Sequence, residues 1–105
     1  MKLVPMYTVS NRYYIYENNE VVGVLEYVNY GDEIEIKYIK IHEEYRRMGI
    51  ATRVVNELKK EGVVITGDSL PGAIEFWKSM NAYFYDPFVD DDDDDWISLI
   101  PFYIK

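Results

Sequence analysis

The chain has 105 residues, enough for one small domain spanning 1–105, and 49% of them are hydrophobic, including 11 Tyr. Its formal net charge of −8 argues against direct binding to nucleic acid or to an anionic membrane face, and leaves room for a basic substrate or partner. The absence of Cys excludes disulfides and thiolate metal sites. No apolar run approaches the ~20 residues that span a bilayer. Met1–Pro5 does not begin a signal peptide, so we expect a soluble, cytoplasmic protein.

The first part of the chain is rich in β-forming residues and predicts a meander of strands. The predicted strands are Tyr7–Val9 as a short edge, Tyr13–Glu17, Val21–Tyr30 and Glu33–Ile41. Asn18-Asn19 and Gly31-Asp32 supply the turns between the longer segments. In the last strand, regular alternation predicts that Ile34 and Ile36 point one way and that Ile39 and Ile41 point the other.

A helix and a buried strand follow. Apolar residues at helical spacing predict a helix over Met48–Glu61, which Gly62 ends. Val63–Thr66 is continuously apolar, as is typical of a parallel strand in the middle of a sheet.

A second helix and two closing strands complete the predicted fold. Asp68 or Ser69 is the expected cap of the helix, with Pro71 in its first turn, and it runs to about Met80 before Asn81 ends it. The last two predicted strands are Tyr83–Phe88 and Trp96–Ile104, the second being an edge or bulged at Pro101. Counted without the short edge Tyr7–Val9, the order β-β-β-α-β-α-β-β predicts an α/β (α+β) fold with a mixed, mostly antiparallel sheet around one βαβ unit.

The segment Tyr38–Lys60 connects a strand to a helix through a charged turn that contains Gly49. The first N–H groups of a helix have no partner inside it and lie at the positive end of its dipole, so such a turn can bind phosphate. Arg46 and Arg47 add positive charge there. An ordinary strand-to-helix connection has the same spacing, so this geometry alone leaves both interpretations open.

The pattern Arg46-x-x-Gly49-x-Ala51 resembles the (Gln/Arg)-x-x-Gly-x-(Gly/Ala) motif of the GNAT superfamily of acyl-CoA N-acyltransferases. The likeness extends over about residues 13–88 and implies a minimal GNAT-like fold that binds acetyl-CoA. The backbone from Arg47 to Ala51 would hold the pyrophosphate, and the strand end Tyr38–Ile41 the pantetheine arm, where it diverges from the next strand. The residues that the resemblance assigns to the cofactor are Ile39, Lys40, Ile41, Arg46, Arg47, Met48, Gly49, Ile50 and Ala51.

The same resemblance implies direct attack of an amine on the thioester, with an N–H near Ile39 or Lys40 polarising its carbonyl. In one branch of the family the base lies 11 residues before the motif, which here is Glu35; a solvated strand carboxylate is the alternative. Trp77 stands where the family often has an acidic Tyr. Tyr83 or Tyr85 would then supply the phenol near the thiolate, or would simply pack.

The family places two helices between its first two strands, and Ser10–Arg12 is too short for them. Short members of this kind occur in phages and mobile elements. The acceptor side would be open, which suits a lysine or N-terminus of a basic protein, a small amine, or a homodimer whose second subunit supplies the walls.

Asp90–Asp95 is a run of like charge that predicts a solvated hairpin tip, or else a surface that attracts a basic target. His42 is the only His, and no cluster of metal ligands accompanies it, so no metal is expected. Two function classes result. One is an acetyl-CoA-dependent N-acetyltransferase, and the other is a catalytically silent, GNAT-derived protein whose acidic surface binds a basic partner.

Overall fold

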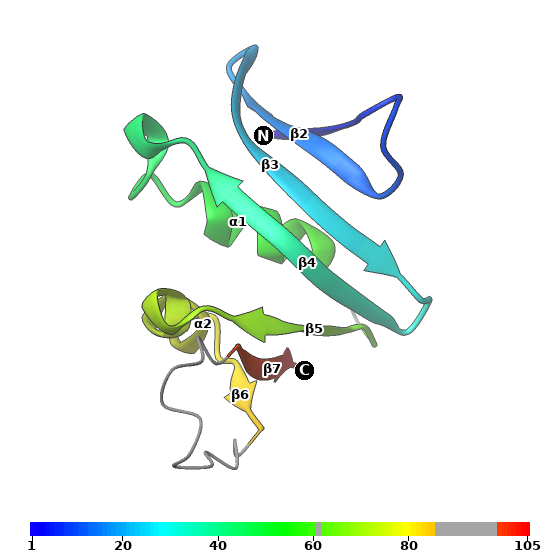
Figure 1. Cartoon of the computed structure of the whole chain (residues 1–105), viewed down its shortest axis with the longest axis vertical. Helices are drawn as coiled ribbons and strands as arrows, with labels where there is room; N and C mark the ends of the chain where they lie inside the picture. The colour runs from blue at the N-terminus through cyan, green and yellow to red at the C-terminus, as the bar shows by residue number, and fades with distance from the viewer. Residues whose placement is uncertain (61, 86–98) are drawn as a thin grey trace.

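A computed structural model of the protein describes residues 1–60, 62–85 and 99–105. These residues form one seven-stranded sheet and two α-helices (Figure 1). The strands are β1 (Lys2–Pro5), β2 (Arg12–Glu17), β3 (Glu20–Asn29), β4 (Glu33–Ile41), β5 (Val64–Ser69), β6 (Tyr83–Phe84) and β7 (Ile100–Ile104). The helices are α1 (Ile50–Leu58) and α2 (Ile74–Ser79), and short 3₁₀ turns, Glu43–Tyr45 and Pro71–Ala73, precede them.

The strand order is β1-β2-β3-β4-β5-β7-β6, and only β4 and β5 are parallel neighbours. Helix α1 connects these two strands, which confirms the predicted α+β fold with one βαβ unit in a mostly antiparallel sheet. The predicted edge or bulge at Pro101 is wrong, because β7 lies between β5 and β6 in regular register. The Pro101 carbonyl accepts a hydrogen bond from the Tyr85 N–H, just after β6. The Pro101 nitrogen, which carries no hydrogen, faces the same side of β7, at the end of β6.

The first strand of the sheet is Lys2–Pro5, and the predicted strand Tyr7–Val9 is wrong. Leu3 pairs with Ile15 on β2 and packs against the core, whereas Tyr7 is fully exposed at 103%. Residues 6–11 form the turn between β1 and β2, closed by a hydrogen bond from the Met6 N–H to the Arg12 carbonyl. Burial of Leu3 therefore decides where the strand lies, and the turn leaves no helix between these strands.

Strand β4 contains a bulge at Lys37. Its register with β3 shifts between Glu26 and Tyr27, so Lys37 has no partner on β3. The extra residue reverses the side-chain alternation beyond it, so the predicted opposite orientation of the two isoleucine pairs is wrong. Four isoleucines instead join the core on one face, three of them buried and Ile39 partly buried: Ile34, Ile36, Ile39 and Ile41.

Helix α1 begins and ends slightly inside the predicted range. Gly49 is its first flanking residue and has a left-handed φ of 75°, which excludes Met48 from the helix. The chain leaves the helix at Lys59, and Gly62 has a φ of 81°. The buried stripe consists of Ile50, Val54, Val55 and Leu58, as helical spacing predicts.

Strand β5 runs three residues past Thr66, to Ser69, so the prediction that Asp68 or Ser69 caps the second helix is wrong. Pro71 instead opens a 3₁₀ turn that leads into α2. Asn81 follows the helix with a left-handed φ of 63°, as expected for a residue that ends a helix.

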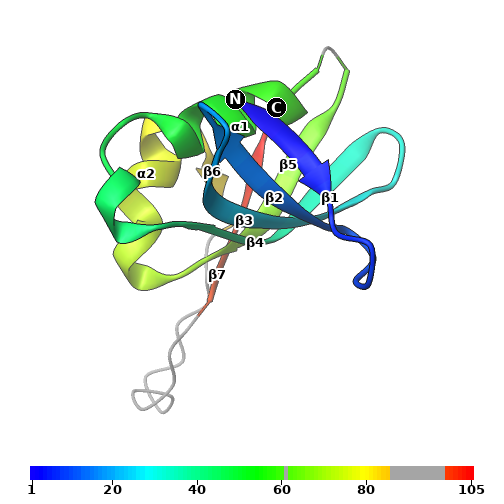
Figure 2. The same cartoon turned by 90° about the horizontal axis from the view of Figure 1, so that it is seen from above.

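The described residues form a single hydrophobic core between the sheet and the helices. Figure 2 shows α1 lying along one face of the sheet. Trp77 of α2 stacks on Phe102 of β7, with ring centroids 4.1 Å apart, and this contact holds the short helix α2 against β7 within the same core. On the opposite face, which no described helix covers, Tyr14 and Tyr38 are 39% and 48% exposed.

The acidic run Asp90–Asp95 lies outside the described residues, as do the later part of the predicted strand Tyr83–Phe88 and the start of Trp96–Ile104. Neither helix that the structure describes has the length and apolar character that crossing a membrane requires.

Gly23 is a position where the close approach of β3 and β4 tolerates no side chain. A Cβ there would lie 2.4 Å from the Lys40 carbonyl oxygen, whereas a Cβ at Gly72 would have no atom within 4 Å. We expect Gly23→Ala to lower the free energy of unfolding by about 1–3 kcal/mol, because backbone must move. Gly72→Ala is the matched control and should change it by less than about 0.5 kcal/mol. Urea unfolding measures both, and equal values for the two variants would contradict the packing described here.

Candidate functional site

The two central parallel strands separate in the middle of the sheet. β4 pairs with β5 only from Glu33 and Val64 to Ile36 and Gly67, after which each strand continues alone. Figure 1 shows the two strands diverging toward the helical end of the sheet. The gap exposes the edge of β4 over its last five residues.

The backbone of β4 offers hydrogen-bonding groups to this gap. The His42 N–H bonds to the Val22 carbonyl on β3, at 2.8 Å. Because backbone groups alternate sides along a strand, Ile39 and Ile41 direct theirs away from β3 and into the gap. Arg46 confirms the direction for Ile41, since its Nε donates to that carbonyl at 3.0 Å. Ile39 therefore presents an N–H and a carbonyl to the gap, whereas the backbone of Lys40 points to β3.

A cavity of about 440 Å³ occupies the gap and is the first of three described here. One wall is β4 from Glu35 to Ile39, and the other includes Asp68 of β5 and Trp77 of α2. The remaining lining residues are Leu70, Ala73, Leu99 and Phe102. The cavity is apolar at the helix end and charged at the end near Glu35, and a mostly apolar lining with a few polar groups is typical of a ligand site.

Next along β4 lies a second cavity, of about 200 Å³, at the start of α1. It is lined by Ile41, Tyr45, Arg46, Arg47, Gly49, Ile50, Ala51, Thr52 and Phe76. No side chain caps the helix at Gly49 in the described structure, so the first N–H groups of α1 face this cavity. A Cβ on Gly49 would meet no atom within 4 Å, which shows that the space in front of the helix is open. The cavity can therefore accept an anion.

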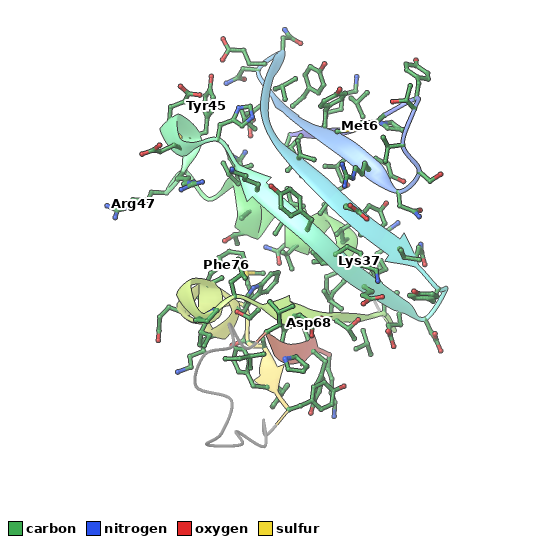
Figure 3. All side chains as sticks on the ribbon, viewed as in Figure 1. Met6, Lys37, Tyr45, Arg47, Asp68 and Phe76 are labelled. Carbon is green, nitrogen blue, oxygen red and sulfur yellow. The ribbon has the colours of Figure 1, made fainter. Side chains whose placement is uncertain are left out.

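The two arginines of this turn play different parts. Arg46 is fixed by its bond to the Ile41 carbonyl and so ties the turn to the end of β4. Arg47 has a left-handed φ of 67°, and its side chain extends away from the sheet into solvent (Figure 3). Tyr45, on the same turn, donates a hydrogen bond to Glu20 of β3. The turn is thus held to β3 and β4, and the guanidinium group of Arg47 remains at its surface.

A third cavity, of about 330 Å³, adjoins the first and shares three residues with it: Glu35, Asp68 and Phe102. Its other lining residues are Tyr30, Glu33, Thr66, Gly67, Tyr85 and Pro101. Glu33, Glu35 and Asp68 make it acidic, so it suits a cation. Because Glu35 and Asp68 line both cavities, a molecule in one would meet a molecule in the other beside these two carboxylates.

Glu35 already has two partners. Lys37 Nζ lies 3.2 Å from its Oε1, and the Tyr30 hydroxyl donates to the same oxygen at 3.3 Å. The hydrogen bond and charge of Glu35 raise the pKa of Lys37 above its ordinary value. Figure 3 shows Lys37 and Asp68 on the neighbouring strands β4 and β5.

The structure separates the three residues suggested for catalysis. Glu35 lines both the first and third cavities, and Tyr85 lines the third. Tyr83 lines none of the three cavities and stacks on Tyr103, with ring centroids 5.2 Å apart. Trp77 is 5% exposed and belongs to the core. Of the residues assigned to the cofactor, Lys40 and Met48 also lie outside the three linings.

Sequence reasoning missed Lys37 and Asp68 as members of this site. Asp68 was expected to cap a helix, because nothing in Val63–Thr66 signals that β5 continues to Ser69. Lys37 follows Glu35 by two residues, so regular alternation along β4 already places the two side chains on the same face, and this spacing is the signal that could have found Lys37.

A model of the acetyltransferase (GNAT) family matches residues 6–83. The chain belongs to the GNAT acetyltransferase family. No match was found among the curated proteins.

Several solved GNAT-type structures share the fold. Naa50 of Arabidopsis thaliana, in complex with the bisubstrate analogue CoA-Ac-MVNAL, is 15% identical at a TM-score of 0.66, over 90% of this chain and 72% of that protein. The N-acetyltransferase YlbP of Bacillus subtilis, in complex with coenzyme A, is 20% identical at a TM-score of 0.67, over 90% of this chain and 67% of that protein. An aminoglycoside 6′-N-acetyltransferase complexed with coenzyme A is 16% identical at a TM-score of 0.69, over 90% of this chain and 73% of that protein. At these identities the likeness concerns the fold.

The contact between Tyr45 and Glu20 predicts a pH-dependent property of the turn. The hydrogen bond to Glu20 raises the pKa of Tyr45, because a carboxylate favours the protonated phenol. Glu20→Gln should bring this pKa back toward its ordinary value, and Glu44→Gln should change it less, since Glu44 contributes only through its more distant charge. In the parent chain the stabilisation from this contact is present below the ordinary tyrosine pKa and is lost as pH rises above it. The pKa of Tyr45 is measured in the parent chain and both variants by following its ring resonances by NMR as pH changes. An unchanged Tyr45 titration in Glu20→Gln would contradict the contact.

Proposed function

We propose that this protein is an N-acetyltransferase that moves an acetyl group from acetyl-CoA to a primary amine. The observation that carries the proposal is the alignment of two cavities along β4, an anion-accepting one at the start of α1 and a mostly apolar one in the gap. The pyrophosphate would lie at the backbone of Gly49, Ile50 and Ala51, close to Arg46 and Arg47. The pantetheine arm would follow β4 toward Glu35.

Within the gap, the N–H of Ile39 is the better candidate to polarise the thioester carbonyl, since that of Lys40 points to β3. The amine would enter from the acidic third cavity and attack the thioester carbon. Glu35 would accept a proton from the amine, directly or through water, and the thiolate of CoA would leave. Tyr85 would be the nearer of the two suggested phenols to that thiolate, because it lines the cavity that contains Glu35.

Relatives support the cofactor and leave the acceptor open. Two of the similar structures contain coenzyme A, and a third contains a bisubstrate analogue made of CoA and a peptide. For this chain, we propose a protein lysine or N-terminus, or a small amine, because the acceptor cavity is open and acidic. A second copy of the chain in a homodimer would be one way to close it. The acidic, Cys-free composition is consistent with a cytoplasmic protein.

A second candidate function is a catalytically silent protein that binds CoA or a basic partner. Two observations favour it: Lys37 neutralises Glu35, and Trp77, which has no acidic hydroxyl, replaces the tyrosine of the family. The two functions differ in turnover. Because the chain contains no Cys, any thiol that appears on incubation with acetyl-CoA and an amine comes from CoA. Amine-dependent thiol release supports the enzyme, and CoA binding without release supports the silent protein.

Gly49→Glu tests the cofactor site, with Gly62→Glu as a matched control. Both positions have a left-handed φ, 75° and 81°, and open space around a Cβ, so both variants carry similar backbone strain. Only Gly49→Glu puts a negative charge in front of the first N–H groups of α1. Calorimetry with CoA should show micromolar binding for the parent chain and Gly62→Glu, and none for Gly49→Glu. Undiminished affinity in Gly49→Glu would contradict the site, and circular dichroism confirms that both variants fold.

A further inference from the structure

We propose that Lys37 is a substrate of the protein's own active site and is acetylated on Nζ by acetyl-CoA bound in the same chain. This inference rests on the proposed N-acetyltransferase function. The structure places a primary amine, that of Lys37, beside the carboxylate of Glu35, which is the proposed base.

Lys37 stands at the point where β4 and β5 separate. It is the bulged residue directly after Ile36, the last residue of β4 that pairs with β5. Its Nζ lies 3.2 Å from Glu35 Oε1, and its side chain is 45% exposed. Lys37 also lines the first cavity, where the thioester would lie. An ammonium group held by Glu35 in this cavity occupies the place that an incoming acceptor amine would take.

Neighbouring lysines do not share this arrangement. Lys40 is three residues further along β4 and is exposed, yet it lines none of the three cavities and has no ion-pair partner among the described residues. It therefore reports the background chemical reactivity of an exposed lysine on the same strand. Any excess reactivity of Lys37 over Lys40 measures the contribution of the site.

The reaction balances without a further reactant. The Lys37 ammonium first loses one proton to Glu35 or to water, and the neutral amine then attacks the thioester carbon. The new C–N bond forms as the C–S bond breaks, and CoA leaves as a thiolate. The nitrogen loses a second proton, which the thiolate takes up. The products are Nε-acetyl-lysine, CoA thiol and one proton.

Acetylation of Lys37 would also change the site. The amide has no charge, so the ion pair with Glu35 would be lost and this carboxylate would be left with Tyr30. An external amine would no longer compete with Lys37 for Glu35. Self-acetylation would thus convert the site from one that is occupied by its own lysine to one that is open to an external acceptor.

Mass spectrometry of the whole chain incubated with acetyl-CoA tests the proposal, together with CoA calorimetry. We expect up to one acetyl group per chain, located at Lys37. Lys37 should be acetylated much faster than Lys40. The rate per molecule should not change on tenfold dilution of the protein, because the reaction is intramolecular. The excess at Lys37 should disappear in Gly49→Glu and persist in Gly62→Glu.

Glu35→Gln separates catalysed from purely chemical acetylation. Loss of the carboxylate removes the contact that raises the pKa of Lys37, so a merely chemical reaction would become faster. If Glu35 acts as the base, acetylation of Lys37 should instead slow by about a hundredfold. Lys37→Arg keeps the positive charge and should show no acetylation at this position.

The outcomes distinguish this inference from the function on which it rests. CoA binding and turnover of external amines, with Lys37 acetylated no faster than Lys40, would overturn the self-acetylation and leave the function standing. Faster acetylation of Lys37 in Glu35→Gln would overturn it as well. Absence of CoA binding would overturn both.

Discussion

The gap between β4 and β5 depends on a column of packed residues: Gly67, Phe102 and Trp77. A Cβ on Gly67 would lie 2.8 Å from Cζ of Phe102 and 3.1 Å from the Ile36 carbonyl oxygen, so only glycine allows the ring to sit against the strand. The ring of Phe102 in turn stacks on Trp77. Through this column, the last paired residues of β4 and β5 are tied to α2, whose Trp77 forms a wall of the gap. Core packing and the geometry of the candidate site are therefore one arrangement.

Much of the fold could be predicted from local sequence. The bounds of β4 were predicted as Glu33–Ile41, because alternating isoleucines and a Gly-Asp turn define that strand without help from its neighbours. The apolar stripe of α1 was also predicted directly from helical spacing. The first strand was missed because its assignment depends on Leu3 meeting Ile15, a contact between distant parts of the chain.

The candidate site divides in the same way. The turn from Arg46 to Ala51 was predicted from its motif to bind phosphate, and the structure places an open cavity in front of it. The charged end of the gap was not foreseen beyond Glu35. Lys37 enters it because it lies two residues from Glu35 on the same face of β4, and Asp68 through the extended end of β5. The spacing of Lys37 was readable from the strand itself, whereas the extension of β5 arises from pairing with β7, which no single segment encodes.

The start of α1 has a consequence for the energetics of the whole domain. A capping side chain satisfies one of the first N–H groups of a helix, and replacing it by Gly costs roughly a few tenths of a kcal/mol. Gly49 offers none, so in the empty protein this cost falls on the helix that covers the sheet. An anion that bonds to those N–H groups would replace the missing cap. Ligand binding and folding are then coupled through one helix terminus, and the chain is least stable when its site is empty.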